Sequence, residues 1–266
     1  MQKLWLTAAA ALVLAACAGQ RAAHEPGAPS LAATPLLTAH SPGILAALSD
    51  PRRPAEDTAR DAARHAAETL AFAGARPGAR VGEILPGGGY FTRLLAIAVG
   101  PEGRVYPVVR PVASVAGWEK PALEVAAQYP NASAVRSEFT AMNYPEPLDV
   151  VFTAQNYHDF HITDYHFGEV AQINSAAFAA LKPGGAYVVI DHSAIAGTAV
   201  SADRQSLHRI DQAAVRREVE AAGFVFDAES EALRNPDDPR TAGIFDPAIR
   251  GHTDQFMMRF RKPAAH

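Results

Sequence analysis

The chain runs Arg80-Val81-Gly82-Glu83-Ile84-Leu85-Pro86-Gly87-Gly88-Gly89 at the point where its fold is decided. The first six residues predict a short strand, and the proline and three glycines predict a sharp turn. A helical pattern starts directly after the turn, at Tyr90, and ends before Gly100. Glycines allow a ligand to approach the backbone, and the first N–H groups of a helix attract anions. The stretch therefore predicts an anion-binding turn, or else a tight strand-to-helix turn that binds nothing.

Strands and helices alternate on both sides of this turn. The predicted strands are 80–85, 104–109, 132–135, 148–153, 186–191, 224–229 and 255–261, and the predicted helices are 55–73, 90–99, 118–128, 167–181 and 211–222. Such alternation favours a parallel sheet with helices on both faces. No helix separates the last two strands, so one antiparallel strand is expected. We predict an α/β, Rossmann-like, doubly wound, mostly parallel seven-stranded sheet with one antiparallel strand near the C-terminus.

The N-terminal residues are not expected to belong to this sheet. An apolar run at 4–16 follows Lys3 and is too short to span a bilayer. It ends in Leu14-Ala15-Ala16-Cys17, which resembles a signal peptide followed by a bacterial lipobox. Cys17 is the single cysteine, so no disulfide can form within the chain. The resemblance implies lipidation of Cys17; an ordinary signal peptide is the alternative.

These features divide the chain into three parts. We predict a signal peptide at 1–16, a lipidated Cys17 with a flexible tether at 17–54, and one domain at 55–266. The tether is rich in Ala, Pro, Gly and Ser, with one short helix near 43–48. A lipid anchor would place the protein on a membrane surface, at the periplasmic face of the cell envelope. Ala18, in place of Asp, resembles lipoproteins sent to the outer membrane.

Charge argues against nucleic acid as a partner. The formal net charge is −4, from 24 Lys and Arg against 28 Asp and Glu, and no basic run occurs. A small-molecule substrate is the more plausible partner, and no feature of the sequence specifies an oligomeric state.

The order of several motifs resembles that of class I S-adenosylmethionine-dependent methyltransferases. These motifs are Glu83 with its glycine turn, Leu148-Asp149-Val150-Val151, and Leu181-Lys182-Pro183-Gly184-Gly185. The resemblance implies S-adenosylmethionine as cofactor. It implies that Glu83 meets the methionyl ammonium group and that Gly87, Gly88 and Gly89 face the methionyl carboxylate. Three further cofactor contacts are expected: Glu138 and Phe139 beside the adenine, and Asn156. A surface glutamate and a core phenylalanine would explain Glu138 and Phe139 equally well.

Further segments resemble a group of bacterial predicted methyltransferases, which implies no particular methyl acceptor. They are Asn156-Tyr157-His158-Asp159, Asp191-His192, Leu207-His208-Arg209-Ile210-Asp211 and 245–251. Two features depart from the class I pattern. Leu85 stands where the family has its first glycine, and the second strand ends in Val109-Arg110, without the acid that holds the ribose.

Catalytic candidates follow the fourth and fifth predicted strands, because ligands bind at the carboxyl ends of parallel strands. His158 with Asp159 is the first candidate for a general base, and His192 with Asp191 is the second. Helix capping and loop packing explain these residues equally well. The segment 207–209 could fold over the same crevice.

The run at 158–166 holds three histidines and two aspartates. Its spacing matches no closed zinc signature, so no metal is predicted. The expected role of the run is a polar loop with a helix N-cap at Asp164.

Three functions remain open. The first is a methyltransferase acting on a small molecule or an envelope component. The second is a lipid-anchored, non-catalytic binding protein that retains the fold; the missing ribose acid and the cytosolic origin of the cofactor favour it. The third is a nicotinamide-dependent oxidoreductase, which would require a dinucleotide glycine spacing and a ribose acid that are absent here.

Overall fold

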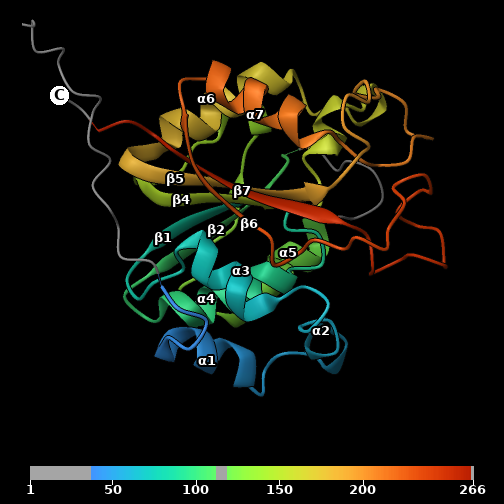
Figure 1. Cartoon of the computed structure of the whole chain (residues 1–266). Helices are drawn as coiled ribbons and strands as arrows, with labels where there is room; N and C mark the ends of the chain where they lie inside the picture. The colour runs from blue at the N-terminus through green and yellow to red at the C-terminus, as the bar shows by residue number, and fades with distance from the viewer. Residues whose placement is uncertain (1–36, 112–118, 265–266) are drawn as a thin grey trace, which may run out of the picture. The chain divides into compact units, whose positions relative to one another are not determined.

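The structure is a computed structural model that describes residues 37–111 and 119–264. Seven strands form one sheet in the order β3-β2-β1-β4-β5-β7-β6 (Figure 1). The strands are β1 (Arg80–Ile84), β2 (Arg104–Val109), β3 (Val135–Arg136), β4 (Leu148–Ala154), β5 (Leu181–His192), β6 (Val225–Ser230) and β7 (Gln255–Arg261). The α-helices are α1 (Pro42–Ser49), α2 (Ala55–Thr58), α3 (Ala66–Ala73), α4 (Tyr90–Val99), α5 (Glu119–Gln128), α6 (Val170–Ala180) and α7 (Gln212–Ala221).

Strands β1 to β5 are parallel to one another. Strand β7 lies between β5 and β6 and runs antiparallel to both. This arrangement follows from the short connection between β6 and β7, which has no helix to carry the chain back across the sheet. The predicted fold class is confirmed, including the antiparallel strand near the C-terminus.

Helices cover both faces of the sheet. Figure 1 shows α6 and α7 on one face and α1, α3 and α4 on the other. The core has one buried cluster on each face: Val150 and Val188 belong to the cluster beneath α4, and Val151 and Val189 belong to the cluster beneath α6. Successive strand residues point to opposite faces, so a strand covered on both sides is apolar throughout. Burial on both faces therefore explains the apolar runs in β4 and β5.

The prediction of one continuous helix at 55–73 is wrong for the middle of this segment. The segment forms two short helices, α2 and α3, which are separated by turns. His65, directly before α3, has a left-handed φ of 42°, which a continuous helix does not allow. The interruption matters because residues of the intervening turns reach the cavity described below.

Helix α1 extends the packed part of the chain upstream of Ala55. It corresponds to the short helix predicted near 43–48, but Ile44 and Ala47 are buried in the core. A Cβ at Gly43 would lie 2.6 Å from the carbonyl oxygen of Ala98, so only glycine permits this approach of α1 to α4. The predicted tether is therefore too long at its C-terminal end.

The predicted signal peptide at 1–16, Cys17 and the first part of the tether lie outside the described residues. Within 37–111 and 119–264, none of the helices combines the length and the apolar character that crossing a membrane requires.

Helix α6 starts later than predicted. Glu169 is its N-cap residue, and the helix begins at Val170 rather than Phe167. Asp164, predicted to cap this helix, lies inside the 3₁₀ turn η4 (Thr163–Tyr165). The N-cap prediction for Asp164 is wrong because a second 3₁₀ turn, η3 (His158–His161), and η4 occupy the segment between β4 and α6.

Two strand predictions also change. Strand β3 is limited to Val135–Arg136, while Ala132 makes only an isolated bridge to Val105. Strand β5 begins at Leu181 rather than Ala186, since Leu181 pairs with Leu148 across an irregular register. The residues 182–185, predicted as a turn, therefore fall within a bulged start of the strand.

Candidate functional site

The glycine turn connects β1 to α4 and is as sharply bent as the sequence predicts. Gly87 and Gly89 have left-handed φ values of 54° and 76°, which explains glycine at both positions. Leu85, where class I methyltransferases have their first glycine, also has a left-handed φ, of 52°. The N-cap residue of α4 is Gly89, which has no side chain to cap the helix. The first N–H groups of α4 are therefore left for a ligand or water.

A cavity of about 730 Å³ opens beside this turn, at the carboxyl ends of β1, β2 and β4. Open α/β sheets bind their ligands at this edge, and the volume suits a cofactor-sized molecule. Leu85 and Tyr90 form part of the wall and leave the hollow beside Glu83 open. The remaining lining residues are Arg60, Arg64, Pro86, Gly87, Gly88, Phe91, Val108, Val109, Arg110, Pro121, Phe139, Ala154, Gln155, Asn156, Asp159, Phe167, Phe245 and Arg250.

Glu83 is a buried acid in the cavity wall. Glu83 is 3% exposed, and its Oε2 accepts a hydrogen bond of 2.5 Å from the hydroxyl of Thr92 on α4. Burial raises the pKa of Glu83 to about 7, although the Thr92 bond and the charge of Arg64 both oppose this rise. A buried carboxyl group with one hydrogen-bond donor lacks the partners that would stabilise its charge. A cationic ligand group would supply one.

Arg60 and Arg64 reach the cavity from the turns between α2 and α3. Nη2 of Arg64 donates a hydrogen bond of 2.6 Å to Oε1 of Gln155, and the guanidinium group lies 4.6 Å from the centre of the Tyr90 ring. Burial, together with the charge of Arg60, lowers the pKa of Arg64 to about 10. Arg64 therefore stays positive at neutral pH. The cavity is thus lined by an acidic residue, Glu83, and a positively charged one, Arg64, a combination that suits a zwitterionic ligand.

At the end of β2 stands a basic residue, where class I methyltransferases carry an acid. Arg110 lines the cavity, and its Nε donates a hydrogen bond of 2.7 Å to Oε2 of Glu138. Glu138, predicted to contact the cofactor, is engaged in this ion pair and does not itself line the cavity. Its neighbour Phe139, in the 3₁₀ turn η2 (Phe139–Ala141), is 1% exposed and does line it.

The end of β4 is attached to the glycine turn through Asn156. Nδ2 of Asn156 donates a hydrogen bond of 2.9 Å to the carbonyl oxygen of Leu85, and Oδ1 accepts one from the Thr153 hydroxyl. Both groups of the amide are thereby oriented. Phe245 and Arg250, from the loop before β7, also line the cavity, and Phe245 is 62% exposed.

Asp191, at the end of β5, pairs with His158 rather than with the ring of His192. It is fully buried and accepts hydrogen bonds of 2.7 Å from the His158 backbone N–H and 2.8 Å from His158 Nδ1. Burial lowers the pKa of His158, but the carboxylates of Asp191 and Asp159 outweigh it and raise the pKa to about 10. A histidine held in this way is a donor, not a ready base.

His192 has a different environment. Its Nδ1 lies 2.7 Å from the Thr253 hydroxyl, and burial lowers its pKa to about 4. The ring is therefore neutral at neutral pH. It lies 6.0 Å from the His158 ring, centre to centre, and does not line the cavity.

The predicted site residues divide into two groups. Those that line the cavity are Glu83, Gly87, Gly88, Phe139, Asn156 and Asp159, and those that do not are Gly89, Glu138, His158 and His192. Gly89 faces α5 instead, where a Cβ would lie 2.6 Å from Cγ2 of Val125. Arg60 and Arg64 were not predicted at all, because nothing in their local sequence distinguishes them from surface arginines. Arg110 and Arg250 stood in segments that the sequence singled out, but neither was predicted to line the cavity.

The two neighbouring glycines should differ in what an added methyl group does to stability. Gly89→Ala is expected to destabilise the fold by about 2–4 kcal/mol, because alanine is strained at a left-handed φ and would collide with Val125. Gly88→Ala is the matched control: its Cβ meets open space, and its φ is not left-handed. Urea unfolding of both variants measures the difference, and equal free energies of unfolding would contradict the described turn.

Comparison with known proteins leaves the family open at the level of sequence. No model of a known protein family matches the chain, and no curated protein matches it either.

Solved structures do match. A SAM-dependent methyltransferase from Aquifex aeolicus is 17% identical, with 73% of this chain and 88% of that chain covered and a TM-score of 0.52. The N-methyltransferase NodS from Bradyrhizobium japonicum WM9 is 13% identical, with coverages of 78% and 99% and a TM-score of 0.52. The [4+2]-cyclase SpnF is 18% identical, with coverages of 82% and 86% and a TM-score of 0.54. At these identities the likeness concerns the fold, which is that of the class I methyltransferases.

Proposed function

We propose that this chain is an S-adenosylmethionine-dependent methyltransferase whose cofactor binds in the cavity beside the glycine turn. One observation carries this proposal: a buried acid, Glu83, and a positive group, Arg64, line the same cavity as the exposed turn Gly87-Gly88. The methionyl part of the cofactor is a zwitterion and needs both charges.

The residues present fit this cofactor. The ammonium group would be held by Glu83, and the carboxylate by Arg64 together with the first N–H groups of α4. Gly88 leaves open space where a Cβ would stand, so the backbone of the turn is accessible to a ligand. Phe139 and Val109 offer an apolar surface for the adenine. Bound in this way, S-adenosylmethionine supplies a methyl group on a positively charged sulfur.

The acceptor would enter beside Asp159, Phe245 and Arg250. These three lining residues combine a carboxylate, an exposed aromatic ring and a positive charge. Methyl transfer depends mainly on alignment of donor and acceptor. We therefore propose a small-molecule or envelope acceptor with a polar group that Asp159 can orient. His158 would act on the acceptor only by orienting Asp159, which lies 3.2 Å from its Nε2. His192 stays a predicted catalytic residue, and its ring contacts Thr253.

We also propose that the protein is exported and anchored at the periplasmic face of the envelope through Cys17, on the strength of the lipobox-like sequence Leu14-Ala15-Ala16-Cys17. Cys17→Ser is expected to abolish incorporation of labelled palmitate and to release the protein from the membrane fraction. Labelling that persists in the variant, or no labelling of the wild type, would contradict the anchor.

A non-catalytic, lipid-anchored binding protein is the second candidate. Arg110 in place of the ribose acid favours it, because it removes the usual acceptor for the ribose hydroxyls. SpnF, named as a cyclase, is a neighbour in fold whose name describes a different reaction.

Labelled cofactor separates the two candidates. The protein is incubated with S-adenosylmethionine that carries an isotopically labelled methyl group, together with small-molecule and envelope extracts. A methyltransferase forms a labelled product and S-adenosylhomocysteine in equal amounts, above a control lacking the protein. Cofactor binding without transfer to any fraction would favour the binding protein.

A further inference from the structure

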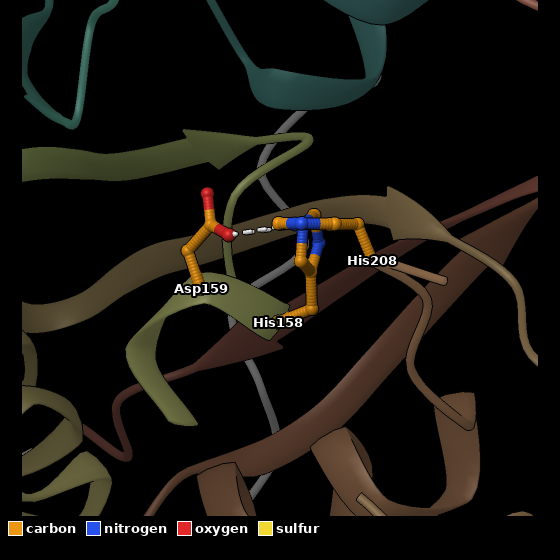
Figure 2. Close-up of side chains that lie close together, drawn as sticks. All are labelled: His158, Asp159 and His208. Atoms are coloured by element: carbon orange, nitrogen blue, oxygen red, sulfur yellow. Dashed lines mark hydrogen bonds and ion pairs between the residues drawn. The ribbon is translucent and has the colours of Figure 1, made fainter. Parts of the chain in front are cut away.

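Three potential metal ligands converge next to the cavity. Nε2 of His158, Oδ1 of Asp159 and Nδ1 of His208 form a triangle with edges of 3.2, 3.2 and 3.3 Å. Figure 2 shows the carboxylate of Asp159 turned toward the two imidazole rings. His208 comes from the segment before α7, about 50 positions along the chain, and all three side chains are at least four-fifths buried.

The outer hydrogen bonds of both histidines fix where their protons lie. Nδ1 of His158 lies 2.8 Å from the Asp191 carboxylate, and Nε2 of His208 lies 3.0 Å from the carbonyl oxygen of Arg204. Both partners are acceptors, so these two nitrogens carry hydrogen. In the neutral form of each ring the remaining nitrogen is an acceptor, and both of these nitrogens face the carboxylate oxygen of Asp159. Three acceptors at this distance require a cation between them, either a proton or a metal ion.

We propose that His158, Asp159 and His208 bind a zinc ion. In a tetrahedral zinc site with bonds of about 2.0 Å, ligand atoms are about 3.3 Å apart, which agrees with the observed triangle. In a six-coordinate site with the same bond length they would be about 2.8 Å apart, so the tetrahedron fits better. Two imidazoles and one carboxylate are also ligands that zinc favours.

The surroundings complete such a site. Asp191 orients His158 from behind, as carboxylates do in zinc sites where histidine is the ligand. The two carboxylates, Asp159 and Asp191, balance the two charges of the ion. Three protein ligands leave the fourth position for water or for an oxygen atom of a second ligand. Since Asp159 also lines the cavity, this position lies at the cavity wall.

The sequence analysis predicted no metal because it considered only ligand spacing within 158–166. Two ligands do come from that run, but the third is His208, which only the fold brings to them. The zinc site does not rest on the proposed function, and it can be tested with metal alone.

The experiment titrates the untagged, metal-free full chain with Co²⁺, followed by Zn²⁺. Tetrahedral Co²⁺ absorbs visible light strongly, whereas six-coordinate Co²⁺ absorbs weakly. We expect one Co²⁺ per chain with strong absorption, displaced by one Zn²⁺. Asp159→Asn and His208→Asn are each expected to lose this absorption. Asparagine suits position 208 because His208 has a left-handed φ of 52°.

The matched control is His166→Asn. His166 has nearly the same left-handed φ, 51°, and lies outside the triangle. It should bind Co²⁺ as the wild type does. If the wild type binds neither ion, a shared proton holds the triangle together and the zinc site is disproved. Unchanged binding by folded Asp159→Asn and His208→Asn disproves it too.

X-ray absorption of the zinc-loaded wild type tests the same site without a variant. Two imidazole ligands and oxygen ligands at about 2.0 Å are expected. A spectrum without two imidazoles would overturn the assignment even if the variants fail to fold.

Discussion

Replacing Glu83 by glutamine is expected to make the cofactor-free protein more stable at pH 8 and to weaken cofactor binding. Burial raises the pKa of Glu83 from its ordinary value of 4.5 to about 7. Between these values the folded protein keeps a proton that the unfolded chain releases. Stability is therefore lost as the pH rises through this window, and the loss is complete above pH 7. Glutamine has no proton to lose, and it can still accept the Thr92 hydrogen bond.

The gain in stability and the loss of cofactor affinity can both be estimated. The pKa difference corresponds to about 3 kcal/mol of additional stability for Glu83→Gln at pH 8, and to almost none at pH 4. Loss of a charge-assisted hydrogen bond to the methionyl ammonium should weaken S-adenosylhomocysteine binding by about 10- to 100-fold. Urea unfolding at both pH values and calorimetric titration measure the two effects.

Glu68→Gln is the control, because Glu68 is an exposed residue on α3. It should change neither quantity. A Glu83→Gln variant that gains no stability at pH 8 would show that the carboxyl group is not held in the unfavourable environment described here. A variant that binds as tightly as the wild type would remove Glu83 from the cofactor site.

Replacing Gly88 by leucine is expected to abolish cofactor binding while preserving the fold. Gly88 is exposed in the cavity wall, has no left-handed φ, and presents open space where a Cβ would stand. The leucine side chain would extend into the space that the methionyl group needs. Affinity should fall by more than about 100-fold, a loss of at least about 3 kcal/mol.

The control for this prediction is Gly88→Ala, which adds one methyl group at the same position. It should bind with intermediate affinity, and both variants should melt within a few degrees of the wild type. Full binding by a folded Gly88→Leu variant would place the cofactor away from the glycine turn.

Much of the fold is predictable because its signals are local. Helix α4 and strands β2 and β7 have the predicted bounds, since each is a mainly apolar stretch between polar or glycine-containing turns. The order of strands and helices was sufficient to predict the sheet. The antiparallel strand followed from the absence of a helix between 224–229 and 255–261.

Failures occurred where distant contacts override local preference. The segment 55–73 has a helical pattern, but it breaks before α3, and Arg64 bonds to Gln155, 91 positions along the chain. Helix α1 was assigned to a tether because eight residues are too few to reveal its close approach to Ala98.

The site was predictable only in part, for the same reason. Residues next to strand ends, such as Glu83, Asn156 and Asp159, reach the cavity because the sheet places all carboxyl ends of its parallel strands at one edge. Pairing between side chains was not predictable. Asp191 was expected to support its neighbour His192, whereas it supports His158, and His208 joins that pair from another loop.

The central claim is that a small zwitterionic cofactor binds between Glu83 and Arg64 beside the glycine turn. Calorimetric titration of the folded wild-type chain with S-adenosylhomocysteine tests it most directly, with NAD⁺ as the comparison ligand. The expected result is one S-adenosylhomocysteine bound per chain and no binding of NAD⁺. Absence of heat with S-adenosylhomocysteine, or equal binding of NAD⁺, would contradict the claim and leave this chain with the methyltransferase fold alone.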